Sequence, residues 1–239
     1  MTRNASRRRW RAPALTVALY AGLAAATMQI APLFGREPLP CFGGEGAALR
    51  SASPLYCALN RHYATPEAIA LTEALAAHVA REVPGAITLT LDASFPFING
   101  FPLLPHLSHD DGEKIDIAFY YLDGDGRPRP GEMASPLGYW GFEQPRAGEA
   151  QPCAGRRDWL TLRWDMDLFQ PLVRREWRID PESLGAALRW LAETGPEYGL
   201  GRVLIEPHLL ERLEVDAPHF RFQGCRAARH DDHIHYQLR

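Results

Sequence analysis

Two short segments, far apart in the chain, hold five of its nine histidines. The first, residues 106–116, reads His-Leu-Ser-His-Asp-Asp-Gly-Glu-Lys-Ile-Asp, and the second, residues 230–239, reads His-Asp-Asp-His-Ile-His-Tyr-Gln-Leu-Arg. Both segments run into residues that alternate between apolar and polar side chains, which is the pattern of a β-strand with one buried face. A fold that brings the two segments together gathers imidazoles and carboxylates in one place. The need to bring these two segments together constrains the architecture more than any other feature of the sequence.

The strand spacing selects three of these side chains as candidate metal ligands. His235 falls on the polar face of the C-terminal strand, opposite Ile234. Asp116 falls on the polar face of the earlier strand, and Gly112 provides a bend that lets His109 approach it. Two imidazoles and one carboxylate, with a fourth position open for water, form a ligand set that zinc uses in catalysis. The sequence therefore predicts a site for Zn²⁺ where the two strands meet.

The order of these residues resembles that of a known family of zinc peptidases. The patterns His-x-x-His-x-x-Gly-x-x-x-Asp and His-x-x-His-x-His, in this order, are similar to those of the penicillin-insensitive murein endopeptidases. That family belongs to a wider group that includes the D-Ala-D-Ala peptidases and the Hedgehog fold. Ser108 and the stretch 202–207 also fit the family pattern. Asp110 stands where a glutamine is usual, and residues 113–114 also depart from the usual pair, so the resemblance leaves the substrate preference open.

The resemblance implies roles for six residues. The zinc ligands would be His109, Asp116 and His235, and the surrounding catalytic histidines would be His233, His230 and His106. Among these histidines, His233 is the best placed general base, because no glutamate stands near the C-terminal ligand and an imidazole titrates close to neutral pH. Four aspartates next to the histidines either orient the imidazoles or are solvated acids: Asp110, Asp111, Asp231 and Asp232.

The function that follows is a zinc-dependent hydrolase of the cell envelope that cleaves peptide bonds in peptidoglycan cross-links or stem peptides. Either an endopeptidase or a carboxypeptidase fits. A closed structural zinc site is disfavoured, because such sites rely on cysteine thiolates and neither motif contains a cysteine. The alternative function is a catalytically silent, membrane-anchored peptidoglycan-binding module that retains the zinc site.

Residues 1–37 have the composition of a signal or anchor segment. Five arginines lie within the first eleven residues, and residues 12–35 contain no charged side chain. A basic head before an apolar run is typical of secretory signals, and about 20 apolar residues suffice to span a bilayer. The alanines at 24–26 would suit a signal peptidase, whereas the length of the run favours an uncleaved anchor in the cytoplasmic membrane. Either outcome places the rest of the chain in the periplasm or cell envelope.

Charge and cysteine content agree with that compartment. The net charge of −3 disfavours a nucleic-acid partner, for which a basic excess would be expected. The four cysteines permit two disulfides in an oxidising space, with three possible pairings. Pairing Cys41 with Cys57 would close a small loop, and pairing Cys153 with Cys225 would tie a central loop to the segment before the second histidine motif. Buried free thiols are the alternative.

The remaining patterns predict a domain over residues 65–239, preceded by an irregular extension over residues 38–64. Helices are expected at 65–84, 165–174 and 180–194 with a helical turn at 209–213, strands at 87–91, 115–121, 203–205 and 233–238, and irregular chain at 123–157. These elements do not alternate as βαβ units, so they predict an α+β fold with a largely antiparallel sheet flanked by helices. The resemblance makes this fold Hedgehog/DD-peptidase-like.

Overall fold

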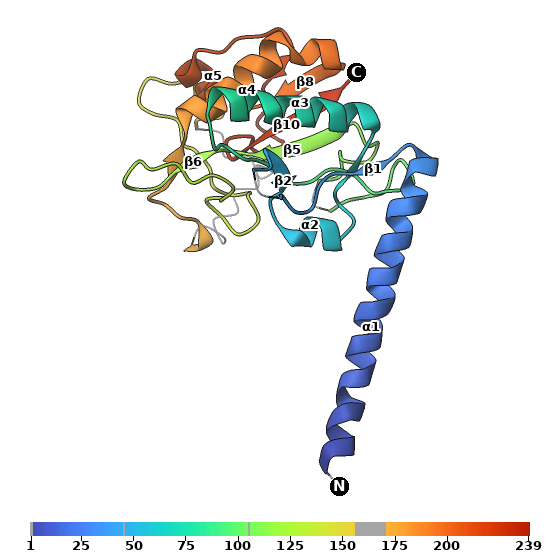
Figure 1. Cartoon of the computed structure of the whole chain (residues 1–239). Coiled ribbons are helices and arrows are strands. Elements are labelled where there is room, and N and C mark those ends of the chain that lie inside the picture. The colour runs from blue at the N-terminus through green and yellow to red at the C-terminus, as the bar shows by residue number, and fades with distance from the viewer. Residues whose placement is uncertain (1, 45, 105, 156–170) are drawn as a thin grey trace.

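The computed structural model describes residues 2–44, 46–104, 106–155 and 171–239, with the backbone alone for residues 2–11. A sheet lies at the centre of the domain with two long helices packed on one face, and an N-terminal helix projects away from it (Figure 1). The predicted helix over 165–174 falls mostly on residues 156–170, which lie outside the described residues.

Six strands form the central sheet, and it is open. In spatial order they are β2 (Leu49–Ser51), β4 (Thr88–Thr90), β5 (Lys114–Ala118), β10 (His233–Leu238), β8 (Leu200–Leu204) and β9 (Phe220–Arg221). The three central pairings are antiparallel, whereas β2 runs parallel to β4 and β8 runs parallel to β9. The predicted combination of helices with a sheet is confirmed, but the sheet is mixed. Its parallel edges arise from crossover connections, such as the one through α5 (Pro207–Leu213) that joins β8 to β9.

Strands β5 and β10 lie side by side, and their residues point to the faces that the alternation predicts. His235 pairs with Asp116, so both point to the same face, while Ile234 pairs with Ile117 and points to the other. Both isoleucines are fully buried. The apolar faces of the two strands therefore carry the core, and their polar faces are left to carry the histidines and Asp116.

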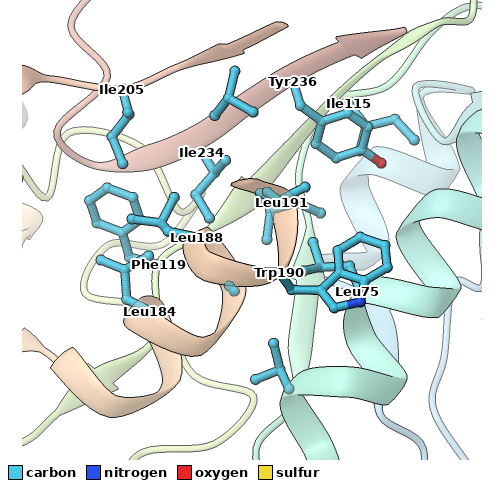
Figure 2. Close-up of a cluster of buried hydrophobic side chains, with 14 of the residues drawn as sticks. Leu75, Ile115, Phe119, Leu184, Leu188, Trp190, Leu191, Ile205, Ile234 and Tyr236 are labelled. Atoms are coloured by element: carbon cyan, nitrogen blue, oxygen red, sulfur yellow. The ribbon is translucent and has the colours of Figure 1, made fainter. Parts of the chain in front are cut away.

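Two helices cover the apolar face of the sheet. They are α3 (Pro66–Glu82) and α4 (Pro181–Glu193), and each begins where the sequence predicts. The hydroxyl of Thr65 accepts a hydrogen bond from the backbone N–H of Ala68, which caps the first turn of α3. Figure 2 shows Leu75 of α3 and Leu191 of α4 in the same buried cluster as Tyr236 of β10. This packing holds the apolar face of β10 against the helices, so its opposite face carries the site.

The segment 38–64 is not the irregular extension that the sequence predicts. It contains β2, α2 (Pro54–Ala58) and most of the small β1–β3 sheet, formed by β1 (Glu37–Pro38) and β3 (Tyr63–Ala64). Strand β2 is a three-residue Leu-Arg-Ser edge strand that exists through its pairing with β4. Such a strand is too short for local periodicity to reveal, because its stability comes from its neighbour in the sheet.

Both disulfides join the cysteine pairs that were suggested from the sequence. Cys41 bonds to Cys57 and Cys153 bonds to Cys225, so all four cysteines are paired. The first disulfide ties α2 to the chain that follows β1. The second ties the long stretch after β6 (Tyr121–Leu122) to the segment before β10. Two disulfides are typical of proteins outside the cytoplasm.

The N-terminal helix is long and apolar enough to cross a membrane. Helix α1 (Thr2–Ile30) continues into the short helix η1 (Ala31–Phe34), and the stretch Ala12–Phe34 has a mean hydropathy of 1.6. A signal peptide and a membrane anchor share these properties. The helix is therefore compatible with both of the roles predicted for residues 1–37.

A buried histidine far from the two motifs gives a prediction about acid stability. His62 is 4% exposed, and burial lowers its pKa to about 4. The unfolded chain binds more protons than the folded chain between that pKa and 6.5, so the free energy of unfolding falls as pH drops through this window. Replacing His62→Gln should remove on the order of 3 kcal/mol of the stability difference between pH 7 and pH 4. Urea unfolding of the original protein and the variant at pH 7 and pH 4 measures this change. If the free energy of unfolding falls by the same amount in both proteins, the prediction is wrong.

Candidate metal centre

Three donor atoms converge on the polar face of β5 and β10. His109 Nε2 lies 3.2 Å from His235 Nδ1, and Asp116 Oδ1 lies 3.3 Å from the first nitrogen and 2.8 Å from the second. All three residues are nearly completely buried. Ligand atoms around a tetrahedral zinc ion at bond lengths of 2.0–2.1 Å are separated by about 3.3 Å. The spacing of these three atoms therefore fits a small divalent cation.

The approach of His109 to Asp116 depends on the turn before β5. Gly112 has a φ of +84°, in the left-handed region, and a side chain at this position would collide with the guanidinium group of Arg36. The backbone N–H of Gly112 also donates a hydrogen bond of 3.0 Å to the hydroxyl of Ser94. The bend predicted at this glycine is thus confirmed.

Hydrogen bonds outside the cluster hold two of the three candidate ligands. His109 Nδ1 lies 3.1 Å from the carbonyl oxygen of Ala93, to which it donates, so its Nε2 faces Asp116 and is the nitrogen that could bind a metal after losing its proton. The hydroxyl of Tyr139 donates to Asp116 Oδ2 at 2.7 Å, which leaves Oδ1 for the cluster. Partners of this kind orient the ligands of protein metal sites and raise their affinity.

The electrostatics of the cluster favour a cation. Burial raises the pKa of Asp116, but His109 and other nearby imidazoles outweigh it and hold that pKa well below its usual value. Burial lowers the pKa of His235 to about 4, although Asp116 opposes this. Burial also lowers the pKa of His109, yet Asp116 raises it above its ordinary value. The carboxylate thus holds a proton on His109, and a divalent cation would take the place of that proton.

His106, His109 and Asp116 form a second group of three side chains that could hold a metal ion. Its Nδ1 lies 2.8 Å from Asp92 Oδ2 and 3.4 Å from Asp116 Oδ2. If the tautomer with the proton on Nδ1 is present, this nitrogen faces the two carboxylates and the lone pair of the ring is on Nε2. The structure therefore offers two possible third partners for His109 and Asp116, namely His235, which the sequence predicts, and His106.

His233 forms a dyad with Asp232 beside the cluster. Its Nδ1 lies 2.5 Å from Asp232 Oδ1, and the other carboxylate oxygen accepts a hydrogen bond from the backbone N–H of Trp140. This arrangement aims Nε2 at the cluster, where it lies 3.7 Å from Asp116 Oδ1. Burial lowers the pKa of His233, but Asp116 and Asp232 outweigh it and raise that pKa to about 9.

His230 lies on the other side of His233. The ring centroids of His230 and His233 are 4.9 Å apart, and those of His230 and His235 are 5.6 Å apart. Burial lowers the pKa of His230 well below its usual value, so the ring is neutral at physiological pH. Its Nδ1 has no hydrogen-bond partner among the described residues. A neutral imidazole in this position can accept or donate one hydrogen bond without adding charge.

The four flanking aspartates divide into two groups. Asp232 orients a site histidine, as described above. Asp110 and Asp111 instead pair with Lys114, and Asp231 pairs with Arg229. Of the two roles left open for these acids, the orienting one therefore applies to Asp232, whereas the other three form ion pairs of their own.

The sequence did not single out three residues that complete the site. Asp92 is 2% exposed and accepts hydrogen bonds of 2.5 and 2.8 Å from the guanidinium group of Arg61. Its backbone N–H donates to the hydroxyl of Tyr139 at 3.3 Å. Asp92 directly follows the alternating stretch 87–91. Its place at the end of a predicted strand is the sequence feature that could have indicated a site residue. Arg61 and Tyr139 come from irregular stretches whose local pattern carries no such signal.

A pocket of about 400 Å³ opens beside the cluster. Its polar end is formed by His106 together with the buried side chains of His233, Asp92 and Asp232. Its wall is apolar and includes Leu55, Leu59, Leu104, Leu137, Trp140 and Phe142. An apolar pocket in which a few polar groups converge is the usual form of a small-molecule or peptide site.

No protein-family model matches this chain, and no curated protein matches it. The resemblance to the murein endopeptidases therefore rests on the two histidine motifs themselves. The geometry of the cluster and its pocket carries the functional interpretation.

The hydrogen bond from Tyr139 to Asp116 gives a prediction about metal affinity. Tyr139→Phe removes this bond and retains the ring. We expect the dissociation constant for zinc to rise by about 10- to 100-fold, which is typical for loss of a partner that orients a metal ligand. Competition with a chromophoric chelator measures this. Tyr198→Phe is the control, because Tyr198 is 40% exposed and its ring contacts Trp190 of α4, and this change should leave the affinity unchanged. Equal affinities in all three proteins would contradict the role given to Tyr139.

Proposed function

We propose that this chain is a zinc-dependent hydrolase of the cell envelope that cleaves peptide bonds in peptidoglycan cross-links or stem peptides. The observation that carries the proposal is the convergence of His109 Nε2, Asp116 Oδ1 and His235 Nδ1 within 3.3 Å of one another. Because a peptide-sized pocket adjoins this cluster, a substrate can reach it. The resemblance to murein endopeptidases supports the choice of metal and substrate.

Zinc would supply a Lewis acid and a nucleophile at neutral pH, since it polarises a carbonyl and lowers the pKa of water to about 7. His233 is placed to take the proton of the attacking water and to return it to the leaving amine. Asp232 holds its Nδ1, so Nε2 performs the transfer. The elevated pKa of His233 depends in part on the Asp116 carboxylate, whose charge a cation would offset. The imidazole would then be able to act as a base.

The other two histidines suit a different task. His106 has a 19% exposed side chain on the pocket, and its Nδ1 lies near the carboxylates of Asp92 and Asp116. His230 is buried and neutral. We assign both to positioning the substrate and to donating hydrogen bonds to the carbonyl oxygen as negative charge develops on it. Such donors are worth several kcal/mol where water is excluded.

The decisive experiment combines metal analysis with digestion of peptidoglycan. The full chain, purified in detergent, should carry about one zinc ion per molecule. It should also release peptide fragments from purified sacculi, and the masses of these fragments identify the bond that is cut. Zinc without digestion would favour the catalytically silent binding module. A chain that neither carries nor takes up a transition metal would refute the proposal.

We also propose that residues 12–35 remain attached as an anchor in the cytoplasmic membrane. The support is that Ala31, just beyond α1, is fully buried in the domain, so the helix is continuous with folded structure. The remainder of the chain should lie outside the cytoplasm. N-terminal sequencing of the membrane-extracted protein distinguishes an anchor from a cleaved signal. A C-terminal reporter that is active in the cytoplasm alone would contradict the topology.

A further inference from the structure

The pocket beside the cluster has an entrance made of exposed apolar side chains. Leu55, Leu59 and Leu104 line the pocket and are 54%, 62% and 72% exposed. We call these three residues the apolar mouth. Several large aliphatic side chains that are exposed together mark a surface that contacts another apolar body.

The junction between α1 and the domain is a fixed turn without a flexible linker. The backbone N–H groups of Gly35 and Arg36 donate hydrogen bonds of 3.1 Å to the carbonyl oxygens of Pro32 and Ala31. Phe34, the last residue of the apolar stretch, packs its ring edge-on against Phe97 at a centroid distance of 5.4 Å. The direction in which α1 leaves therefore determines how the domain sits on a membrane that α1 spans.

Apolar contacts continue from this junction toward the mouth. Phe97 packs against Phe95 at 5.6 Å, and Phe95 stacks on Phe101 at 3.9 Å. The same loop continues to Leu104 of the mouth. Ile98, in the middle of this loop, is 56% exposed. The end of the apolar helix thus contacts the same loop that carries Leu104 of the mouth.

The mouth lies on the side of the domain toward which α1 extends. Figure 1 shows α2, which carries Leu55 and is followed by Leu59, displaced from the junction in the direction of the N-terminus of α1. Helix α4 and strand β8 lie on the opposite side. Because the apolar stretch Ala12–Phe34 reaches the junction itself, a bilayer that holds this stretch brings its surface against the side that bears α2.

We infer that the apolar mouth rests on the phospholipid bilayer, so that the pocket opens at the membrane surface. The partner is the apolar interface of the lipid leaflet, into which aliphatic side chains partition favourably. This inference depends on the proposed anchor and not on the chemistry of the site. A consequence is that peptides reach the histidine cluster along the membrane surface.

The test uses the full chain in phosphatidylcholine nanodiscs. A small fluorescent amino acid is introduced at Leu59 or, separately, at Leu104, and lipids with a nitroxide at a shallow acyl position serve as quenchers. The matched control carries the same fluorophore at Tyr198, which is 40% exposed and lies between α4 and β8 in the chain. We expect quenching at both mouth positions to exceed that at position 198 several-fold. Thermal unfolding compared with that of the unlabelled chain verifies that each labelled protein is folded.

Equal quenching at the mouth and at position 198 would overturn the inference. So would quenching at the mouth that requires two chains per nanodisc, since this would assign the surface to a second copy of the chain. Release of the protein from membranes by alkaline washing would overturn both the anchor and the inference. None of these outcomes affects digestion of soluble peptidoglycan fragments, so the proposed hydrolase activity is tested separately.

Discussion

Replacing His235→Ala is expected to abolish both metal binding and hydrolysis, whereas His233→Ala is expected to retain the metal and lose catalysis. His235 Nδ1 is one of three donor atoms within 3.3 Å of one another, and its removal leaves two ligands. His233 Nε2 lies 3.7 Å from Asp116 Oδ1, beside that set. Loss of a positioned acid or base lowers kcat by roughly 10²- to 10⁴-fold. The two histidines share a strand face, yet they should give opposite results for metal content.

Elemental analysis and turnover on the same preparations measure both effects. Asp232→Asn provides a matched control for His233, because it retains the shape of its hydrogen-bond partner and removes the charge. It should keep the metal and reduce kcat less than His233→Ala. Metal loss in His233→Ala with retention in His235→Ala would reverse the two roles. Unchanged hydrolysis in both variants would place the active site elsewhere.

Arg61→Ala is expected to destabilise the domain by about 3–5 kcal/mol, the usual cost of leaving a buried charge without its partner. Arg61 donates two hydrogen bonds to Asp92, and the side chains of the pair are 13% and 3% exposed. Its guanidinium group also donates to the carbonyl oxygen of Leu104. Without Arg61, the Asp92 carboxylate would keep only its contact with His106 and would lose its two hydrogen bonds from a guanidinium group.

Denaturant unfolding of a double variant separates charge from packing. Arg61→Ala combined with Asp92→Asn removes both charges and should recover much of the lost stability. Arg127→Ala is the control, because Arg127 and its partner Asp125 are both highly exposed and such pairs contribute little. If the double variant is as unstable as Arg61→Ala alone, the loss reflects packing and not the unpaired carboxylate.

Those features of the fold that have a local cause could be predicted from the sequence. The alternation of residues 233–238 places Ile234 toward the helices and His235 toward the site, and the register of β10 with β5 agrees. The helix caps at Thr65 and Asp180 were predictable for the same reason, since each bonds to a backbone N–H two or three residues away. The bend at Gly112 follows from the backbone freedom of glycine.

Features that depend on distant partners could not be predicted. Strand β2 owes its existence to β4, and the parallel edges of the sheet owe theirs to the path of the connections. Tyr139 and Arg61 join the site through contacts that span 23 residues to Asp116 and 31 residues to Asp92. Nothing in the local sequence around either residue specifies such contacts, because they are set by tertiary packing.

The position of β10 has a consequence for how the domain forms. It lies between β5 and β8 in the sheet, although it follows every other strand in the sequence. A chain that crosses a membrane from its N-terminus delivers this strand after the others. Until it arrives, β5 and β8 have unpaired edges toward each other, and such edges favour aggregation. The central sheet should therefore form slowly and only after β10 is available. Pairing of β10 with β5 should complete the sheet and assemble the histidine cluster in the same step.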